Sequence, residues 1–261
     1  MTSPILITGG TGSLGSRLVP LLASAGRRVR VLSRGEHADA GPVEYVRGDL
    51  ETGEGLAEAV LGIETVVHGA GSAKRDALKA RNLLHALAAE ATATHIVYIS
   101  VVGADTTPVR SAMDRAALGY FEQKHLAERA IVESGIPWSV LRATQFHEFF
   151  AALGDLGDRM PVVPSFAGFR YQPVDARDVA ERLRDLALGA PTLSVEEIGG
   201  PRVYPMEELL RGYLRARGLR RPVIPLHIAG AAARAQRAGA NLTPDHATGS
   251  GTWEEYLGRI G

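Results

Sequence analysis

Tyr120 and Lys124 are the two residues of this sequence whose types and spacing most directly suggest proton-transfer chemistry. They are four positions apart in a stretch of helical periodicity, so their side chains are expected on one face of a helix. A free tyrosine, with a pKa of about 10, is a poor acid near neutrality, but a neighbouring ammonium favours the phenolate and lowers that pKa. Tyr120 is therefore a candidate general acid or base, and Lys124 the residue that tunes it.

The scarcity of lysine adds weight to this pair. Lys74, Lys79 and Lys124 are the only lysines, and the other 26 of the 29 basic residues are arginines. A compact ammonium at position 124, in a chain that otherwise uses guanidinium groups, suggests a specific task.

Ser100 is the third candidate for the chemistry. It ends an expected strand, and an open α/β sheet presents its functional groups at the carboxyl ends of its strands. Its hydroxyl could hold the same substrate oxygen that receives the proton, or it could simply cap the strand end. Ser111 is the alternative serine.

The elements that must position these residues follow an alternating pattern of short apolar runs and longer helical segments. The expected strands are residues 4–8, 28–33, 43–47, 63–68, 95–100 and 138–143. The clearest helices between them are residues 13–25, 76–91 and 116–134. Such alternation predicts βαβ units, and therefore an α/β fold with a Rossmann-type, doubly wound parallel sheet.

The pattern loosens after residue 145, where prolines punctuate shorter segments. Residues 1–145 are predicted to form the Rossmann core. Residues 146–261 are predicted to add late core elements and a smaller cap that binds substrate, with helices near 176–188, 205–217 and 227–238.

A glycine-rich loop, Thr8-Gly-Gly-Thr-Gly-Ser-Leu-Gly15, follows the first expected strand and opens the first expected helix. It satisfies both the G-x-x-G-x-x-G and the G-x-G-x-x-G spacings. Glycines there permit a tight turn, a close approach of backbone to pyrophosphate, and a helix N-terminus that faces the anion. The residues predicted to bind a dinucleotide are Gly9, Gly10, Thr11, Gly12, Ser13, Leu14 and Gly15.

Ser33 and Arg34 end the second expected strand, where the residue that reads the adenosine ribose is expected. A hydroxyl and a guanidinium suit a 2′-phosphate, which favours NADP(H) over NAD(H). In the alternative, Glu36 serves the ribose and Arg34 is solvated. Further cofactor contacts are predicted after the third and fourth strands, at Asp49, Leu50, Gly69, Ala70 and Gly71. Asp49 could instead be a turn or cap residue.

Four motifs together resemble the short-chain dehydrogenase/reductase superfamily, and its atypical, NmrA-like NAD(P)-binding branch in particular. They are Thr8–Gly15, Tyr98-Ile-Ser100, Tyr120-x-x-x-Lys124 and Leu141-Arg-Ala-Thr-Gln-Phe146. The resemblance covers residues 1 to about 190. It implies that Tyr120 is the general acid or base, that Lys124 also binds the nicotinamide ribose, and that Ser100 polarises a substrate carbonyl.

The same resemblance implies where the substrate binds. The segment after the sixth strand usually lines the nicotinamide and substrate region of the superfamily. The substrate-pocket candidates are therefore Thr144, Gln145, Phe146 and His147.

Composition excludes several other classes of function. The absence of cysteine excludes disulfides, thiolate catalysis and cysteine-ligated metals. The eight histidines are scattered without ligand spacing, so no metal site is predicted. A formal net charge of zero with interspersed signs argues against nucleic acid. No apolar run approaches the roughly 18 residues of a membrane span, a cytoplasmic location is expected, and no stripe indicates an oligomeric state.

We therefore predict an enzyme: an NADPH-dependent oxidoreductase that reduces a carbonyl or quinone-type small molecule. Two alternatives remain. NmrA-like relatives include dinucleotide-sensing regulatory proteins with little or no turnover, and an epimerase or dehydratase would hold its NAD(P) tightly. The intact pair of Tyr120 and Lys124 favours the first interpretation.

Overall fold

The computed structural model describes residues 3–72 and 74–260. The chain forms two compact units, each assembled from three separate stretches. Unit 1 contains Met1–Ser100, Gln123–Arg142 and Val179–Glu196, and unit 2 contains Val101–Glu122, Ala143–Asp178 and Glu197–Gly261.

A seven-stranded sheet with the order β3-β2-β1-β4-β5-β6-β9 organises unit 1. Its strands run parallel; Ile5 of β1, for example, is in register with Val29 of β2 and with Thr65 of β4. The strands are β1 (Ile5–Thr8), β2 (Val29–Ser33), β3 (Val43–Arg47), β4 (Thr65–His68), β5 (His95–Val101), β6 (Trp138–Ala143) and β9 (Val195–Ile198). The order reverses direction between β1 and β4, which is where doubly wound sheets bind ligands. The predicted fold class is confirmed.

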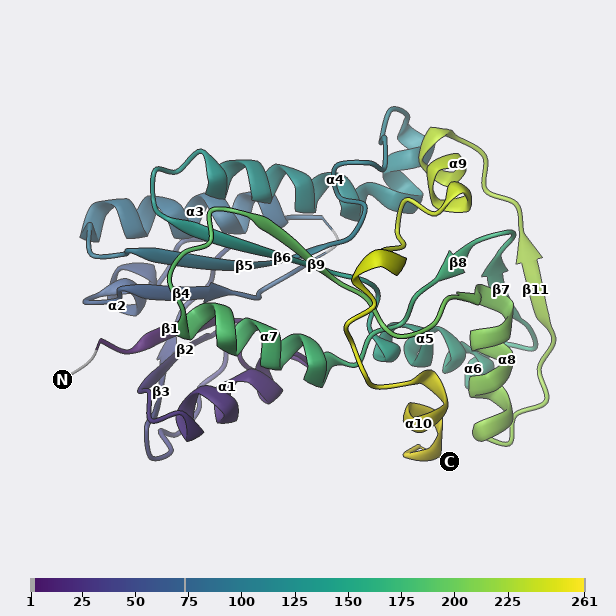
Figure 1. The fold of residues 1–261 in the computed structure, drawn as a ribbon, viewed down its shortest axis with the longest axis horizontal. Coiled ribbons are helices and arrows are strands. Elements are labelled where there is room, and N and C mark those ends of the chain that lie inside the picture. The colour runs from purple at the N-terminus through teal and green to yellow at the C-terminus, as the bar shows by residue number, and fades with distance from the viewer. Residues whose placement is uncertain (1–2, 73, 261) are drawn as a thin grey trace. The chain divides into compact units, whose positions relative to one another are not determined.

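Helices cover both faces of this sheet (Figure 1). α1 and α7 lie on one face, and α3 and α4 lie on the other. The helices are α1 (Gly15–Ser24), α2 (Leu56–Val60), α3 (Asp76–Glu90), α4 (Ala112–Val132) and α7 (Ala176–Leu188). A buried cluster joins Leu6 and Ile96 of the sheet to Leu83 of α3 and Ile131 of α4. The apolar strand runs and helix faces seen in the sequence thus form one core.

The helix that carries Tyr120 and Lys124 is kinked. α4 begins at Ala112, four residues before the predicted start, and Leu118 within it has non-helical angles of φ −136° and ψ 17°. Tyr120 and Lys124 both follow the kink, on a regular part of the helix. They are therefore one helical turn apart, as the spacing predicts.

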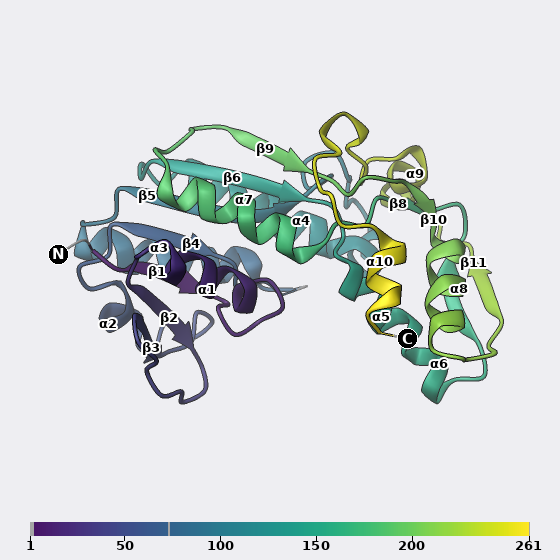
Figure 2. The same cartoon turned by 60° about the horizontal axis from the view of Figure 1, so that its bottom comes forward.

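Unit 2 has a separate core with two small sheets. β7 (Val163–Phe166) pairs in parallel with β11 (Val223–Leu226), and β8 (Arg170–Tyr171) pairs antiparallel with β10 (Tyr204–Pro205). The helices are α5 (His147–Gly154), α6 (Leu156–Arg159), α8 (Met206–Ala216), α9 (Ala231–Ala238) and α10 (Trp253–Gly258), with a 3-10 turn at Pro244–His246. Figure 2 shows α8 packed beside α5 and the β7–β11 pair.

Several elements were not predicted from the sequence: β9, α2, α5, α6 and the four short strands of unit 2. β9 illustrates the reason. Its sequence, Val-Glu-Glu-Ile, leaves Val195 exposed because the strand lies at the edge of the sheet. Across the described parts of the chain, no helix is both long enough and apolar enough to cross a membrane.

Candidate cofactor site and active site

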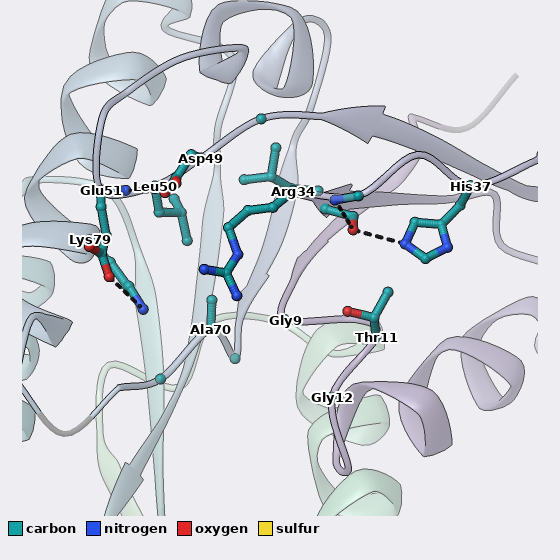
Figure 3. Close-up of a pocket in the computed structure, with 16 residues that line it drawn as sticks. Gly9, Thr11, Gly12, Arg34, His37, Asp49, Leu50, Glu51, Ala70 and Lys79 are labelled. Atoms are coloured by element: carbon teal, nitrogen blue, oxygen red, sulfur yellow. Dashed lines mark hydrogen bonds and ion pairs between the residues drawn. The ribbon is translucent and has the colours of Figure 1, made fainter.

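A pocket with a volume of about 480 Å³ opens at the carboxyl ends of the first strands of unit 1 (Figure 3). Its walls come from the glycine-rich loop, the ends of β2 and β3, the end of β4, and α3. The lining residues are Gly9, Thr11, Gly12, Leu32, Ser33, Arg34, Gly35, His37, Gly48, Asp49, Leu50, Glu51, Gly69, Ala70, Gly71 and Lys79.

The glycines of the loop have different tasks. A Cβ on Gly15 would lie 2.2 Å from the carbonyl oxygen of Gly9, and a Cβ on Gly9 would lie 2.8 Å from backbone atoms of Gly69 and Ala70. Both positions therefore need glycine so that the loop can pack. A Cβ on Gly12 would meet only the Gly9 carbonyl, at 3.4 Å, so Gly12 leaves bare backbone in the pocket wall.

This geometry fits a dinucleotide. Bare backbone at Gly12 permits the close approach of a pyrophosphate, and α1 begins three residues later without an acidic residue in its first turn. The positive end of the helix dipole is thus uncompensated by carboxylates of that turn.

Arg34 reaches into the middle of the pocket between Thr11 and Leu50 (Figure 3). Beside it, Ser33 Oγ accepts a hydrogen bond from the Gly35 amide at 3.2 Å and lies 3.0 Å from His37 Nε2. Glu36, the alternative ribose ligand, is exposed and pairs with Arg47 at 3.3 Å instead of lining the pocket.

Most predicted cofactor residues lie around this pocket. Gly10, Ser13, Leu14 and Gly15 do not line it, and Gly15 acts through packing. Asp49 lines the pocket but also accepts a hydrogen bond from the Glu51 amide at 2.7 Å, which is the turn role left open by the sequence. Sequence reasoning missed Leu32, Gly35, His37, Gly48, Glu51 and Lys79. Of these, Gly48 and Gly35 could have been inferred from their positions beside predicted contacts.

Lys124 is 4% exposed and lies beside the wall formed by Gly71. Its ammonium donates a hydrogen bond to the Ile99 carbonyl at 3.0 Å and lies 3.0 Å from Oδ2 of Asp76. The Tyr98 ring centroid is 4.9 Å from the same nitrogen. A Cβ on Gly71 would lie 3.4 Å from this nitrogen, so the ammonium borders the pocket.

Ser100 directly follows Ile99 and is also buried. Within the described part of the chain, its Oγ has no hydrogen-bond partner. A buried hydroxyl normally has one, so this hydroxyl is suited to hold a ligand oxygen.

His68, at the end of β4, belongs to the same buried region. Its Nδ1 lies 2.7 Å from Thr8 Oγ1, and its ring stacks on Tyr98 with centroids 5.4 Å apart. Burial lowers the pKa of His68 to about 3, and the Lys124 charge adds to the effect. The imidazole is therefore neutral near pH 7, as suits a packed strand-end residue.

Tyr120 belongs to unit 2, where it is half-buried against the core and contacts Phe121 edge to face, with centroids 5.7 Å apart. The alternative serine, Ser111, donates its hydroxyl proton to Asp114 Oδ2 at 2.9 Å and accepts from the Asp114 amide at 3.0 Å. These two bonds account for Ser111 as a helix-capping residue.

The substrate-pocket candidates surround the start of α5. Gln145 and Phe146 are half-buried, whereas Thr144 and His147 are buried. Thr144 Oγ1 donates to the Gln172 carbonyl at 2.5 Å. His147 packs against both Trp253 and Tyr256, whose rings stack on each other. Neither of its ring nitrogens has a hydrogen-bond partner among the residues that the structure describes. Burial lowers the pKa of His147.

The strand order, the glycine loop and the pocket together define a dinucleotide-binding protein of the Rossmann type. A family model described as NAD(P)H-binding matches residues 9–183, which is more than half of the chain. The chain belongs to this NAD(P)H-binding family.

Curated relatives of known activity align with much of the chain. A ceramide reductase of Caulobacter vibrioides is 28% identical over 242 residues, which cover 85% of this chain and 73% of the relative. A bifunctional pinoresinol-lariciresinol reductase of Linum usitatissimum is 29% identical over 178 residues, which cover 62% of this chain and 53% of the relative.

Solved structures share the fold. An NADPH-dependent quinone oxidoreductase of Escherichia coli, complexed with NADPH, superposes with a TM-score of 0.80 at 18% identity, covering 98% of this chain and 99% of that chain. A nucleoside-diphosphate-sugar epimerase of Staphylococcus aureus gives a TM-score of 0.73 at 18% identity, covering 97% and 99%. The resemblance to short-chain, NmrA-like proteins is confirmed, and the chain is an NAD(P)H-binding, oxidoreductase-like protein.

Proposed function

We propose that this protein is an NADPH-dependent reductase of a carbonyl or quinone-type small molecule. The observation that carries the proposal is a single pocket that has the Arg34 guanidinium at one wall and the Lys124 ammonium beside another. The two cations match the two ends of the cofactor, a 2′-phosphate and a nicotinamide ribose. The relatives named as reductases support a reduction.

The preference for NADPH over NADH rests on Arg34. Its guanidinium lines the pocket next to Ser33, while Glu36 pairs with Arg47 outside it. A guanidinium can grip a phosphate with two parallel charge-assisted hydrogen bonds, and a carboxylate there would repel it.

The proposed mechanism assigns one task to each of three residues. NADPH, when bound, supplies the hydride that reaches the carbonyl carbon. Tyr120 donates its phenolic proton to the carbonyl oxygen, so that the carbonyl becomes an alcohol. Ser100 donates a hydrogen bond to the same oxygen with a hydroxyl that has no partner among the residues that the structure describes. Lys124, one helical turn after Tyr120, favours the phenolate that remains.

The substrate side is proposed to involve the start of α5. Gln145 and Phe146 are the partly exposed members of the predicted set, so they are proposed as direct contacts. Thr144 and His147 are buried and would support them from behind. Residues 146–261 keep their proposed role of contributing late core elements and a smaller substrate-binding cap.

The test is NADPH oxidation over a panel of ketones, aldehydes and quinones, with wild type compared with Tyr120→Phe at matched cofactor occupancy. Loss of most of the rate in a variant that still binds NADPH would support Tyr120 as the acid. Tyr213→Phe is the matched control, because it removes the same atom from a phenol that donates to Asp155 at 2.5 Å.

Other outcomes point elsewhere. Binding of NADPH without turnover by wild type would favour the dinucleotide-sensing alternative. Equal turnover by wild type and Tyr120→Phe would retain the reductase and exclude Tyr120 as its acid. NAD(P) that stays bound through purification would favour an epimerase or dehydratase.

A further inference from the structure

We propose that Asp76 is a positioning residue that holds the Lys124 ammonium in place at the nicotinamide end of the pocket. The proposal rests on the proposed function, which gives Lys124 its task. Asp76 begins α3 and is 1% exposed. Its Oδ2 lies 3.0 Å from Lys124 Nζ, and its Oδ1 accepts a hydrogen bond from the Ser72 amide. No motif in the sequence points to a role for Asp76.

The burial of this ion pair distinguishes it from an ordinary surface pair. Removing two charges from water is costly, and a buried pair persists only where its geometry is good and further hydrogen bonds satisfy it. Here the ammonium donates to the Ile99 carbonyl and Oδ1 of Asp76 accepts from the Ser72 amide. Oδ2 has no hydrogen-bond partner among the residues that the structure describes, and its contact is the ion pair with Lys124. The pair of Lys79 and Glu51 in the same pocket is different, because Glu51 is 29% exposed and its oxygen lies 3.5 Å away.

An acidic residue in the first turn of a helix is common, because it complements the helix dipole. That role needs solvent or backbone partners, and it does not need a lysine from another helix. The ammonium of Lys124 is instead gripped from two sides, by the carboxylate of α3 and the carbonyl at the end of β5. Its position beside Gly71 therefore depends on Asp76.

Among the contacts that the structure describes for Lys124, the other titratable groups are not carboxylates paired with its ammonium. His68 of β4 is neutral, and Tyr98 of β5 presents its ring to the ammonium. Lys79 is a second cation on α3. On α4 itself, Tyr120 precedes Lys124 by one turn, and Glu128, one turn later, binds Arg142 through both carboxylate oxygens at 2.9 and 2.7 Å.

The charge of Asp76 has a chemical consequence. The carboxylate places a negative charge 3.0 Å from the ammonium, so a neutral amide at this position would leave the Lys124 charge without that balance. Without the carboxylate, the unbalanced ammonium would lower the phenol pKa further, and Lys124 would lose its own proton more easily. Both effects would reduce the fraction of enzyme in which Tyr120 and Lys124 are protonated, and they would do so at a lower pH than in wild type.

The first experiment compares wild type and Asp76→Asn in the rate of NADPH-dependent reduction across pH. We expect kcat to fall by on the order of tenfold, because the ammonium is no longer held in place. We also expect the alkaline limb of the kcat profile to move to lower pH by about one unit. Unchanged kcat together with an unchanged limb would overturn the proposal.

Glu128→Gln is the matched control. It removes another buried carboxylate that pairs with a cation in unit 1. A general effect of a lost buried charge would act in both variants, so we expect Glu128→Gln to lower stability without moving the alkaline limb. An equal shift in both variants would contradict a specific role for Asp76.

Asp76→Glu keeps the charge and moves the carboxylate by one methylene group. It is the second variant, should Asp76→Asn not fold. We expect it to lower kcat while leaving the alkaline limb in place, and unchanged kcat in this variant would also overturn the proposal.

A readout without turnover comes from the three lysines of the chain. With lysine labelled with 15N at Nζ, a buried and hydrogen-bonded ammonium gives a signal protected from exchange, and Lys124→Arg identifies it. We expect Asp76→Asn to lose this signal and Glu128→Gln to keep it. If wild type reduces no substrate, the proposed function is wrong, but the spectra still test the positioning role of Asp76. A Lys124 signal that persists in Asp76→Asn would overturn that role.

Discussion

Nδ1 of His68 lies 2.7 Å from Oγ1 of Thr8, which joins the last residues of the paired strands β4 and β1 below the cofactor pocket. The same hydroxyl accepts a hydrogen bond from the amide of Ala70, a pocket-lining residue, at 3.3 Å. Burial keeps the imidazole neutral near pH 7, so Nδ1 either accepts the hydroxyl proton or, in the other tautomer, donates to the hydroxyl. Protonation of His68 would place a charge in this buried region, which is costly.

This relationship predicts that stability falls in acid. The pKa of His68 is about 3 in the folded protein against 6.5 for the free side chain, so between these values the unfolded chain binds more protons. The stability that comes from burying a neutral His68 imidazole is fully present above pH 6.5, and it is lost progressively as the pH falls towards 3. At pH 5 the free energy of unfolding should be about 2 kcal/mol lower than at pH 7 because of His68.

Urea unfolding at pH 7 and pH 5 measures this loss. His68→Asn should show a smaller drop between the two pH values, because asparagine does not titrate there. His85→Asn is the control, since His85 is exposed on α3, and it should behave as wild type. The same drop in His68→Asn as in wild type would contradict the role of His68.

Arg34 should separate the two cofactors. Replacing it with alanine removes charge-assisted hydrogen bonds to a 2′-phosphate, so the Kd for NADPH should rise by roughly 10- to 100-fold. The Kd for NADH should change little. Arg47→Ala, which removes an exposed guanidinium outside the pocket, should affect neither. Fluorescence titration measures all three, and equal weakening of NADPH and NADH by Arg34→Ala would exclude the phosphate contact.

Substituting two glycines of the loop with alanine should have different effects on stability and on cofactor binding. Gly15→Ala forces a Cβ to within 2.2 Å of the Gly9 carbonyl oxygen and 2.5 Å of Gly10 Cα, so it should lower the free energy of unfolding by about 2 kcal/mol or more. Gly12→Ala has room in the folded chain but intrudes on the pocket, so it should weaken cofactor binding by about tenfold with little change in stability.

Thermal unfolding and NADPH titration distinguish these outcomes. Gly258→Ala is the control, because a Cβ there meets no atom within 4 Å. If Gly12→Ala bound NADPH as tightly as wild type, the close approach of cofactor to this backbone would be wrong.

The buried pair of Glu128 and Arg142 should dominate the stability of its surroundings. Glu128→Gln removes the buried carboxylate that binds the Arg142 guanidinium through both oxygens, which should cost about 3 kcal/mol in the free energy of unfolding. The double variant Glu128→Leu, Arg142→Met should recover most of this loss, because two apolar groups need no compensation. A double variant as unstable as the single one would argue against this account.

The core strands could be predicted because their local sequences carry the evidence. Runs such as Ile5–Thr8 and His95–Val101 are buried along their whole length, so they read as continuous apolar segments. β9 was not predicted because it lies at the edge of the sheet, where few side chains need to be buried. Only Ile198 of its four residues is buried, so its sequence has no apolar run. The kink at Leu118 could not be predicted either, because no proline lies within this helix.

The glycine loop could be predicted for a similar reason: its residues are contiguous, and its task depends on backbone conformation. Lys79 could not, because it comes from α3, a separate segment that meets the loop only around the folded pocket. The sequence singled out Lys124 by its spacing and rarity. It contained no sign that Asp76, on a different helix, would be its partner.

The sequence alone therefore determined six of the seven strands of the sheet, the dinucleotide loop and the candidate chemistry of Tyr120 and Lys124, because periodicity and motif spacing act over short stretches of chain. Only the tertiary structure decided which charges surround that chemistry. The ion pair of Asp76 with Lys124 and the neutral His68 depend on burial, which depends on the packing of helices against the sheet. Burial changes the energy of a charge far more than any neighbour in sequence does.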